Sequence, residues 1–397
     1  MPERESLASP RLWLAFATML FVSGIGNTFP VFFPPLLQEF GGSRTATALT
    51  VSLMWTGGAV LGPVAGYLVD RWSPRALIVV GLAAAAVGLG VAALAPTLAV
   101  FTLGLGLGAG TGVALTGMVP QAAVIAVDYR RRRGVATGIA FAGSMAGYVM
   151  ATPAHWIITS LGWRAAVGAY ALAILVLIPF VWRVYPRRLG SGAGVVTVGT
   201  GSVGALARKP AFWALAVFFT LAPHVGLLAT VQHAVYFDTL GYPAWEASLM
   251  LLIGGVLSTS GRALAGVVAD RIGAPATGFL SFGLTLAGTL CLLGLEFWPV
   301  RVLAYGYVLF LFLPIGTRAT IVSLLVPRIA PPGKFGTVFG WLSVGNSLGA
   351  ATGPLLSGAL YDLTHSYLAI YITAVTLVTI AIVALAIFVR GTTNPMP

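Results

Sequence analysis

The stretch GPVAGYLVDRWSPR, residues 62–75, leads from an apolar run into a cluster of charges. Its core, GYLVDR at residues 66–71, recurs as GVVADR at residues 266–271, 200 positions later. Glycines form a second repeat: those at positions 134, 138, 143 and 147 recur at 336, 340, 345 and 349, with the same spacing and an offset of 202. Two repeats at nearly one offset indicate that the chain consists of two related halves, an organisation typical of membrane transporters.

The composition indicates where the two halves reside. Of the 397 residues, 58% are hydrophobic and 8% are charged. Soluble proteins have about 25% charged residues, so this chain lacks the polar side chains to cover a water-facing surface. Apolar runs of about 20 residues, the length that crosses the hydrocarbon core of a bilayer, recur throughout the sequence. We therefore predict an all-α integral membrane protein embedded in a lipid bilayer.

The apolar runs divide into twelve candidate transmembrane helices, six on either side of a Gly-, Ser- and Arg-rich segment. These candidates cover residues 12–37, 46–69, 76–95, 97–127, 134–160, 164–184, 211–238, 244–269, 274–295, 299–326, 334–361 and 365–389. We predict a six-helix bundle over residues 1–184, a cytoplasmic linker over 185–209 and a second six-helix bundle over 210–397. The repeats predict that a pseudo-two-fold axis relates the two bundles.

The distribution of lysine and arginine predicts the orientation. With a cytoplasmic N-terminus, the inner segments hold seventeen of the 22 basic residues and the outer loops hold three. Positive charge is retained on the cytoplasmic side of membranes. We therefore expect a multi-pass protein of the plasma membrane, or of the inner membrane in a Gram-negative bacterium, with both termini in the cytoplasm. This asymmetry also accounts for the net charge of +12 without a nucleic-acid partner.

Two arginines lie inside predicted spans, Arg262 and Arg318, whereas all ten acidic residues fall in loops or at span ends. An arginine near the bilayer centre costs at least ~2.5 kcal/mol and commonly marks a path for an ion or substrate. A guanidinium pairs with both oxygens of a carboxylate and stays charged. We expect a transient anion as its partner. Alternatively, Arg262 hydrogen-bonds helix carbonyls or reaches towards Asp270, and Arg318 is a helix-packing contact.

Uncharged polar side chains in other spans are candidate cavity liners: Asn27, Tyr148, His155 and His224. Histidine titrates near neutral pH. If transport is coupled to protons, His155, His224 or the substrate itself is expected to carry the proton.

The repeated loop resembles the signature G-x3-D-R-x-x-R of the major facilitator superfamily, here formed by Gly66, Asp70, Arg71 and Arg75. The second copy retains Asp270 and Arg271. This resemblance implies that the motif latches a gate.

Two further stretches make the resemblance more specific. GNTFPVFFPPLLQEF (26–40) and RRRRGVATGIAFAGSMAG (130–147) are similar to segments of monocarboxylate-transporter-like and oxalate:formate-antiporter-like members. The resemblance implies that Arg262 holds a substrate carboxylate. Val31 and Ser258 stand where animal monocarboxylate carriers have lysine and aspartate.

Together these observations predict a secondary active transporter of a small organic anion, a mono- or dicarboxylate, that acts as a monomer by alternating access. The single cysteine and the lack of metal-ligand or nucleophile–base spacing predict no metal, no cofactor and no enzymatic activity. Two alternatives remain: efflux of lipophilic drugs, and a non-transporting sensor with the same fold.

Overall fold

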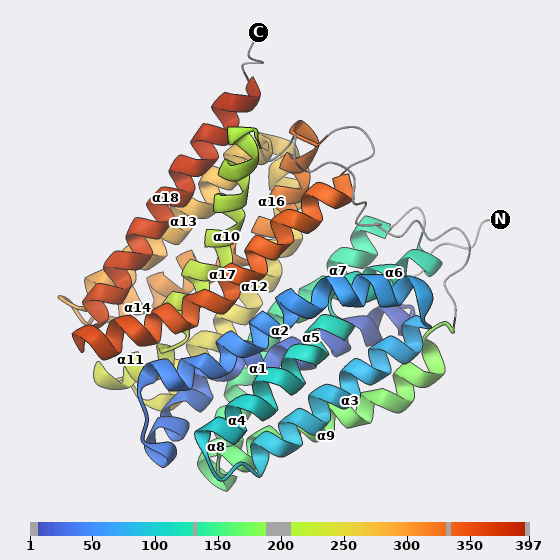
Figure 1. Ribbon diagram of the computed structural model, residues 1–397. Helices are drawn as coiled ribbons and strands as arrows, with labels where there is room; N and C mark the ends of the chain where they lie inside the picture. Colours follow the sequence, from blue (N-terminus) through green and yellow to red (C-terminus); the bar gives the residue numbers. More distant parts are fainter. Residues whose placement is uncertain (1–6, 130–132, 188–207, 331–334, 394–397) are drawn as a thin grey trace.

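The computed structural model describes residues 7–129, 133–187, 208–330 and 335–393, and these residues form helices with no strand among them (Figure 1). In the first half the helices are α1 (Pro10–Phe40), α2 (Arg44–Arg71), α3 (Pro74–Ala93), α4 (Leu98–Leu103), η1 (Gly104–Ala109), α5 (Gly110–Thr116), α6 (Met118–Asp128), α7 (Arg133–Ala146), η2 (Gly147–Met150), α8 (Ala151–Leu161) and α9 (Trp163–Val184). In the second half they are α10 (Pro210–Thr230), α11 (His233–Thr239), α12 (Ala244–Ile272), α13 (Ala274–Leu295), α14 (Arg301–Tyr307), η3 (Val308–Phe312), α15 (Leu313–Ile315), α16 (Arg318–Leu325), η4 (Val326–Arg328), α17 (Phe335–Thr364) and α18 (Tyr367–Thr393).

Within the described residues, consecutive pieces join into twelve helical segments at the predicted positions. Ten of them are long and apolar enough to cross a membrane, and the other two are the 28-residue α2 and the 30-residue α17. The all-α membrane fold is thereby confirmed. The predicted linker at 185–209 lies mostly outside the described residues, so its boundaries stay a prediction.

Several spans that read as continuous in the sequence are interrupted. The fifth changes from α-helix to a 3-10 turn at Gly147–Met150, and the fourth and tenth contain π-helical turns at Gly104–Ala109 and Val308–Phe312. Three glycines lie in the π-helical turn at Gly104–Ala109, where they impose little steric restriction on the backbone. Such turns release backbone carbonyl groups from the regular ladder and are frequent at functional sites.

The last two glycines of each repeat lie in equivalent helix contacts of the two halves. In the first half, a Cβ atom added to Gly143 or Gly147 would collide with the backbone of α1, at Phe16 and Gly24. In the second half, one added to Gly349 would collide with the backbone of α10, at Thr220. The absence of side chains lets these helices approach closely. We call these contacts, α7 and η2 on α1 and α17 on α10, the glycine seams.

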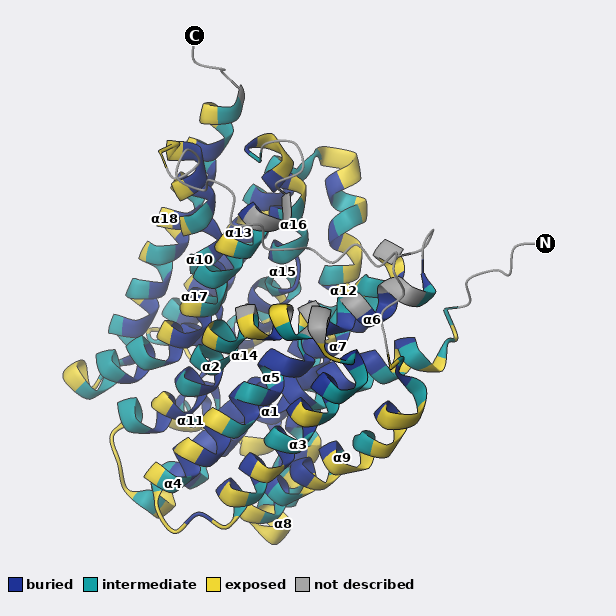
Figure 2. Ribbon diagram, turned by 45° about the vertical axis from the view of Figure 1, so that its right-hand side comes forward, coloured by how far each residue is buried: buried dark blue, intermediate teal, exposed yellow. Residues whose placement is uncertain are grey.

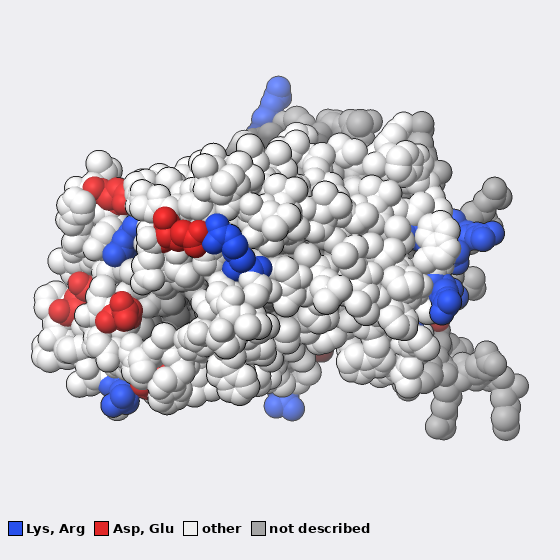
Figure 3. Space-filling model, turned by 90° about the horizontal axis from the view of Figure 1, so that it is seen from below, with Lys and Arg blue, Asp and Glu red and all other residues white. Residues whose placement is uncertain are grey.

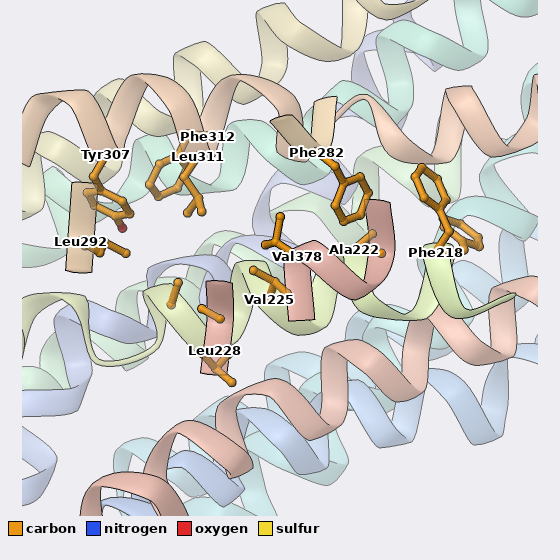
Figure 4. Close-up of a cluster of buried hydrophobic side chains, with 14 of the residues drawn as sticks. Phe218, Ala222, Val225, Leu228, Phe282, Leu292, Tyr307, Leu311, Phe312 and Val378 are labelled. Carbon is orange, nitrogen blue, oxygen red and sulfur yellow. The ribbon is translucent and has the colours of Figure 1, made fainter. Parts of the chain in front are cut away.

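Two large hydrophobic clusters stabilise the helices. One draws nearly all its members from residues 22–185, and the other nearly all from residues 211–388. Figure 4 shows part of the second, where Phe218 and Val225 of α10 lie near Phe282 of α13 and Val378 of α18. Helix α1 is central to the first, with residues 22–33 all buried (Figure 2). The buried faces therefore largely follow the two halves.

The two halves do not run parallel. Their helices lie close together at one end, near α2 and α11, and run apart towards the end that has both termini (Figures 1 and 2). We call the end opposite the termini the far end. On the face seen in Figure 3, most acidic side chains gather at the far end, and a broad band of uncharged residues separates them from a basic cluster. An uncharged band is the surface that a bilayer requires.

Candidate functional site

Arg262 lies on α12 and reaches across to the first half of the molecule. Its Nε donates a hydrogen bond to the carbonyl of Gly316, at 3.2 Å, within the second half. One terminal nitrogen donates to the Phe141 carbonyl on α7, at 2.6 Å, and lies 3.2 Å from the Ser144 hydroxyl. All three acceptors are neutral oxygen atoms. No ion pair to Arg262 is present among the described residues, so its charge is solvated by dipoles alone.

Residues of the first half complete this region. The Asn27 side chain on α1 donates to the Ser144 carbonyl at 2.5 Å, and the Ser144 hydroxyl donates to the Phe141 carbonyl at 2.9 Å. Asn27 is only 3% exposed. The structure thus brings together Arg262 and Asn27, two predicted site residues, through Ser144, which the sequence analysis did not select.

Tyr148 lies one turn further towards the far end, at the junction of the halves. Its ring packs edge-on against Phe312, with centroids 5.2 Å apart, and it lines the same small cavity as Thr230 of α10. An added Cβ at Gly255 would lie 2.8 Å from the Tyr148 Cβ, so α12 passes directly against this residue. Tyr148 and Asn27 share a cavity of about 10 Å³, roughly the smallest space that holds a water molecule. At this depth the junction is therefore closed.

Arg318 lies in a different environment. It is 3% exposed, and its guanidinium carbon lies 4.4 Å from the centre of the Phe282 ring. One terminal nitrogen donates to the Ala222 carbonyl at 2.6 Å, and the other donates to the Thr285 hydroxyl. These partners belong to α10 and α13, and Ala222 and Phe282 are members of the hydrophobic cluster of the second half (Figure 4). Arg318 therefore links three helices of one half, and its described contacts include none from the first half.

The two candidate histidines are separate from Arg262. His224 on α10 shares a 2.8 Å hydrogen bond with the Thr352 hydroxyl on α17, and its Nε2 is buried without a partner among the described residues. His155 on α8 is half-buried. The neighbouring Thr152 donates to the Ser248 carbonyl of α12 at 3.3 Å, which places that part of α8 beside the second half.

The gate motif is only partly described. Gly66, Asp70 and Arg71 lie in the last turns of α2, but the surroundings of all three are outside the described part of the structure. Arg75 donates to the Tyr185 carbonyl from Nε and a terminal nitrogen, at 2.9 and 2.7 Å, within the first half. Asp270 and Arg271 are exposed at the end of α12. The motif's role as a latch stays a prediction.

Acidic residues in the described parts of the chain lie at helix ends or just beyond them. Glu39 at the end of α1 pairs with Arg164, and Glu246 at the start of α12 pairs with Arg301 at 3.1 Å. Burial raises the pKa of the Glu296 carboxyl, which follows α13, while a hydrogen bond with Tyr236 opposes this shift. None of these carboxylates reaches Arg262 or Arg318.

The far end has a further contact between the halves that the sequence analysis did not select, formed around Arg44 and Asp362. The two charges are 318 positions apart in the sequence. The one sequence feature that points to their contact is that they have opposite sign and fall on the same predicted side of the membrane. Among the described residues, hydrogen bonds between the halves lie at the far end, between Thr152 and Ser248, and at Arg262.

Comparison with known proteins identifies relatives along most of the chain. The family model of the Major Facilitator Superfamily matches residues 14–326. Monocarboxylate transporter 13 of Bos taurus is 25% identical over 371 residues, which cover 91% of this chain and 84% of the relative. The oxalate:formate antiporter of Oxalobacter formigenes is 28% identical over 285 residues, covering 69% and 66%. An uncharacterized 38 kDa protein of Thermoproteus tenax is 30% identical, with 98% of both chains covered.

Proposed function

Because the chain belongs to the Major Facilitator Superfamily, we propose that it is a secondary active transporter of a small organic anion. A monocarboxylate or dicarboxylate is the proposed substrate, and the names of two relatives support this class. In the proposed mechanism, the two halves alternately expose one central site to either side of the membrane, with both termini in the cytoplasm.

The environment of Arg262 is the observation on which the proposal depends. A permanent charge inside a span is stabilised there by three neutral oxygen atoms, two of them on the opposite half. A carboxylate would form stronger, charge-assisted hydrogen bonds with the same guanidinium than these neutral acceptors do. An incoming anion can therefore displace the Phe141 and Ser144 contacts, and its binding would directly change how the halves are joined.

The surroundings of the other predicted site residues support different roles for them. Asn27 and Tyr148 lie at the same junction, so we propose that they contact the substrate when the site is open. Arg318 lies within the second half, where its neighbours support a structural role in positioning α10, α13 and α16. His224 and His155 are proposed only as proton carriers, and the motif around Asp70 as a gate at the cytoplasmic end.

The shape of the molecule supports alternating access. The helices of the halves meet at the far end and run apart towards the termini (Figure 1). With the orientation predicted from the basic residues, this arrangement corresponds to a carrier that is closed to the outside. The cavity at Tyr148 and Asn27 is too small for an organic anion, so we propose that it enlarges when the halves move.

A thermal-shift screen of the purified protein tests the substrate class. The ligands are lactate, formate, oxalate, succinate and a lipophilic cationic dye, each at several concentrations. We expect one of the carboxylates to raise the melting temperature of the wild-type protein but not that of Arg262→Gln, because an amide lacks the charge that binds the anion. Arg301→Gln is the matched control, since Arg301 pairs with Glu246 near the far end.

The alternatives predict different results. Stabilisation by the dye alone would favour efflux of lipophilic compounds. Binding of a carboxylate without flux in proteoliposomes would favour a sensor. Equal stabilisation of the wild-type protein and Arg262→Gln by the same carboxylate would remove Arg262 from the site.

A further inference from the structure

The first turn of α2 is capped by a side chain from the other half of the molecule. Asp362, near the end of α17, accepts hydrogen bonds from the backbone N–H of Arg44 at 3.0 Å and of Thr45 at 2.9 Å. The Thr45 hydroxyl also donates to Asp362, at 2.6 Å. Ser43 accepts from Ala46 in the ordinary N-cap position. The first N–H groups of a helix have no partner within the helix, and here the opposite half supplies it.

The side chain of Arg44 makes a second set of contacts to the second half. Its guanidinium carbon lies 3.3 Å from the centre of the Tyr361 ring. One terminal nitrogen donates to Gln232 at 2.8 Å and also to the Tyr367 hydroxyl. Gln232 in turn donates to the backbone and the hydroxyl of Ser357, both at 3.0 Å. Arg44 therefore joins α2 to α17, α18 and the turn between α10 and α11.

The backbones of α2 and α17 meet at the same place. A Cβ atom added to Gly358 would lie 2.6 Å from the Cα of Thr45, so no side chain separates the two helices. The contact borders an open hollow of about 540 Å³ that Arg44, Asp362 and His365 help to line. Water therefore reaches the rim of the contact and can solvate the N–H groups and the carboxylate once they part.

We infer that Asp362 and Arg44 are functional residues of the transport cycle, which together latch the far end closed. Separation of the halves at this end must break the capping of α2, the ion–ring contact and the bond to Gln232 at once. The far end therefore opens only when other interactions compensate for these losses. The inference rests on the alternating-access part of the proposed function and is independent of the anion.

Distance measurements between spin labels test the latch without any substrate. The labels are placed at Leu161→Cys on the first half and Val302→Cys on the second, two far-end positions that are 73% and 81% exposed. The background is Cys291→Ser, because Cys291 is the one native cysteine. The protein is held in lipid nanodiscs, and the distance distribution is recorded for the latch variants and their control.

Asp362→Asn is expected to add a longer-distance population and to raise the ratio of open to closed molecules about tenfold. An amide oxygen accepts hydrogen bonds less well than a carboxylate oxygen, and the NH2 group of the asparagine would face the N–H donors of α2. Asp238→Asn, an exposed acid at the same end, is the control and leaves the distribution unchanged. Arg44→Gln keeps the backbone donors to Asp362 and is expected to give a smaller increase. It serves as the test if Asp362→Asn fails to fold.

Unchanged distances in the folded latch variants would overturn the inference, even if an anion binds. A longer-distance population in both variants, in a protein that no carboxylate stabilises, would support the latch and refute the proposed substrate class.

Discussion

Arg262 and Arg318 are the two arginines that the sequence places inside membrane spans, and the structure gives them opposite surroundings. Arg262 is half-buried and donates to Phe141 of the other half, whereas Arg318 is 3% exposed and donates to Ala222 and Thr285 of its own half. A charge inside a span can therefore belong either to a residue at the junction of the halves or to a residue in the core of one half. The helix face on which each lies determines which role it has.

The largest expected effect is on transport by Arg262→Ala. If the guanidinium holds the substrate carboxylate, its loss removes two charge-assisted hydrogen bonds of about 1.5–3 kcal/mol each, and anion flux in proteoliposomes should fall at least ~100-fold. The variant should still elute as a single folded species. Transport at the wild-type rate would show that the substrate binds elsewhere. Arg262 would then have no functional role that distinguishes it from Arg318.

Arg318→Ala is expected to act on stability. The substitution leaves a cavity beside Phe282 and removes the donors to Ala222 and Thr285, a combined loss of about 2–4 kcal/mol. Unfolding of the detergent-solubilised protein measures it, with Arg262→Ala as the matched variant, which should lose less because its site is half-buried. Equal losses in the two variants would show that the two arginines do not differ in this way.

The smallest effect is expected from Ser144→Ala. The Ser144 hydroxyl accepts from Arg262 in the unliganded protein and so competes with an anion for the guanidinium. Hydrogen bonds between transmembrane helices contribute about 0.6 kcal/mol on average, so the variant should bind the anion roughly threefold more tightly. Titration calorimetry measures the affinity, with Ser144→Thr as the control that retains a hydroxyl. Weaker binding by Ser144→Ala would instead show that Ser144 holds Arg262 in its binding position.

Much of the fold could be predicted because it follows from local patterns. Apolar runs fix the spans, and the last two glycines of each repeat, at positions 143 and 147 and at 345 and 349, mark the two glycine seams. The breaks at Gly147–Met150 and Val308–Phe312 were not predicted, because an apolar run with the right length gives no sign of a change in helix type.

The candidate site could be predicted only in part. Arg262 stands out because charges are rare in apolar runs, and Asn27 and Tyr148 because they are polar. The partners of Arg262 could not be found in this way, since two of them are backbone carbonyls at Phe141 and Gly316 that every residue possesses. The Asp362 contact could not be predicted for a related reason. Charges at helix ends are expected in any membrane protein, and only the tertiary structure shows which of them meet.

The glycine seams have a mechanical consequence. Where backbones touch without intervening side chains, no change of rotamer can alter the contact, so we expect α1 and α7 to move together as one strut, and α10 and α17 as another. Asn27 and Ser144 stand on opposite members of the first strut and remain hydrogen-bonded across it. This hydrogen bond lies within one bundle, so a displacement of the opposite bundle can leave it intact.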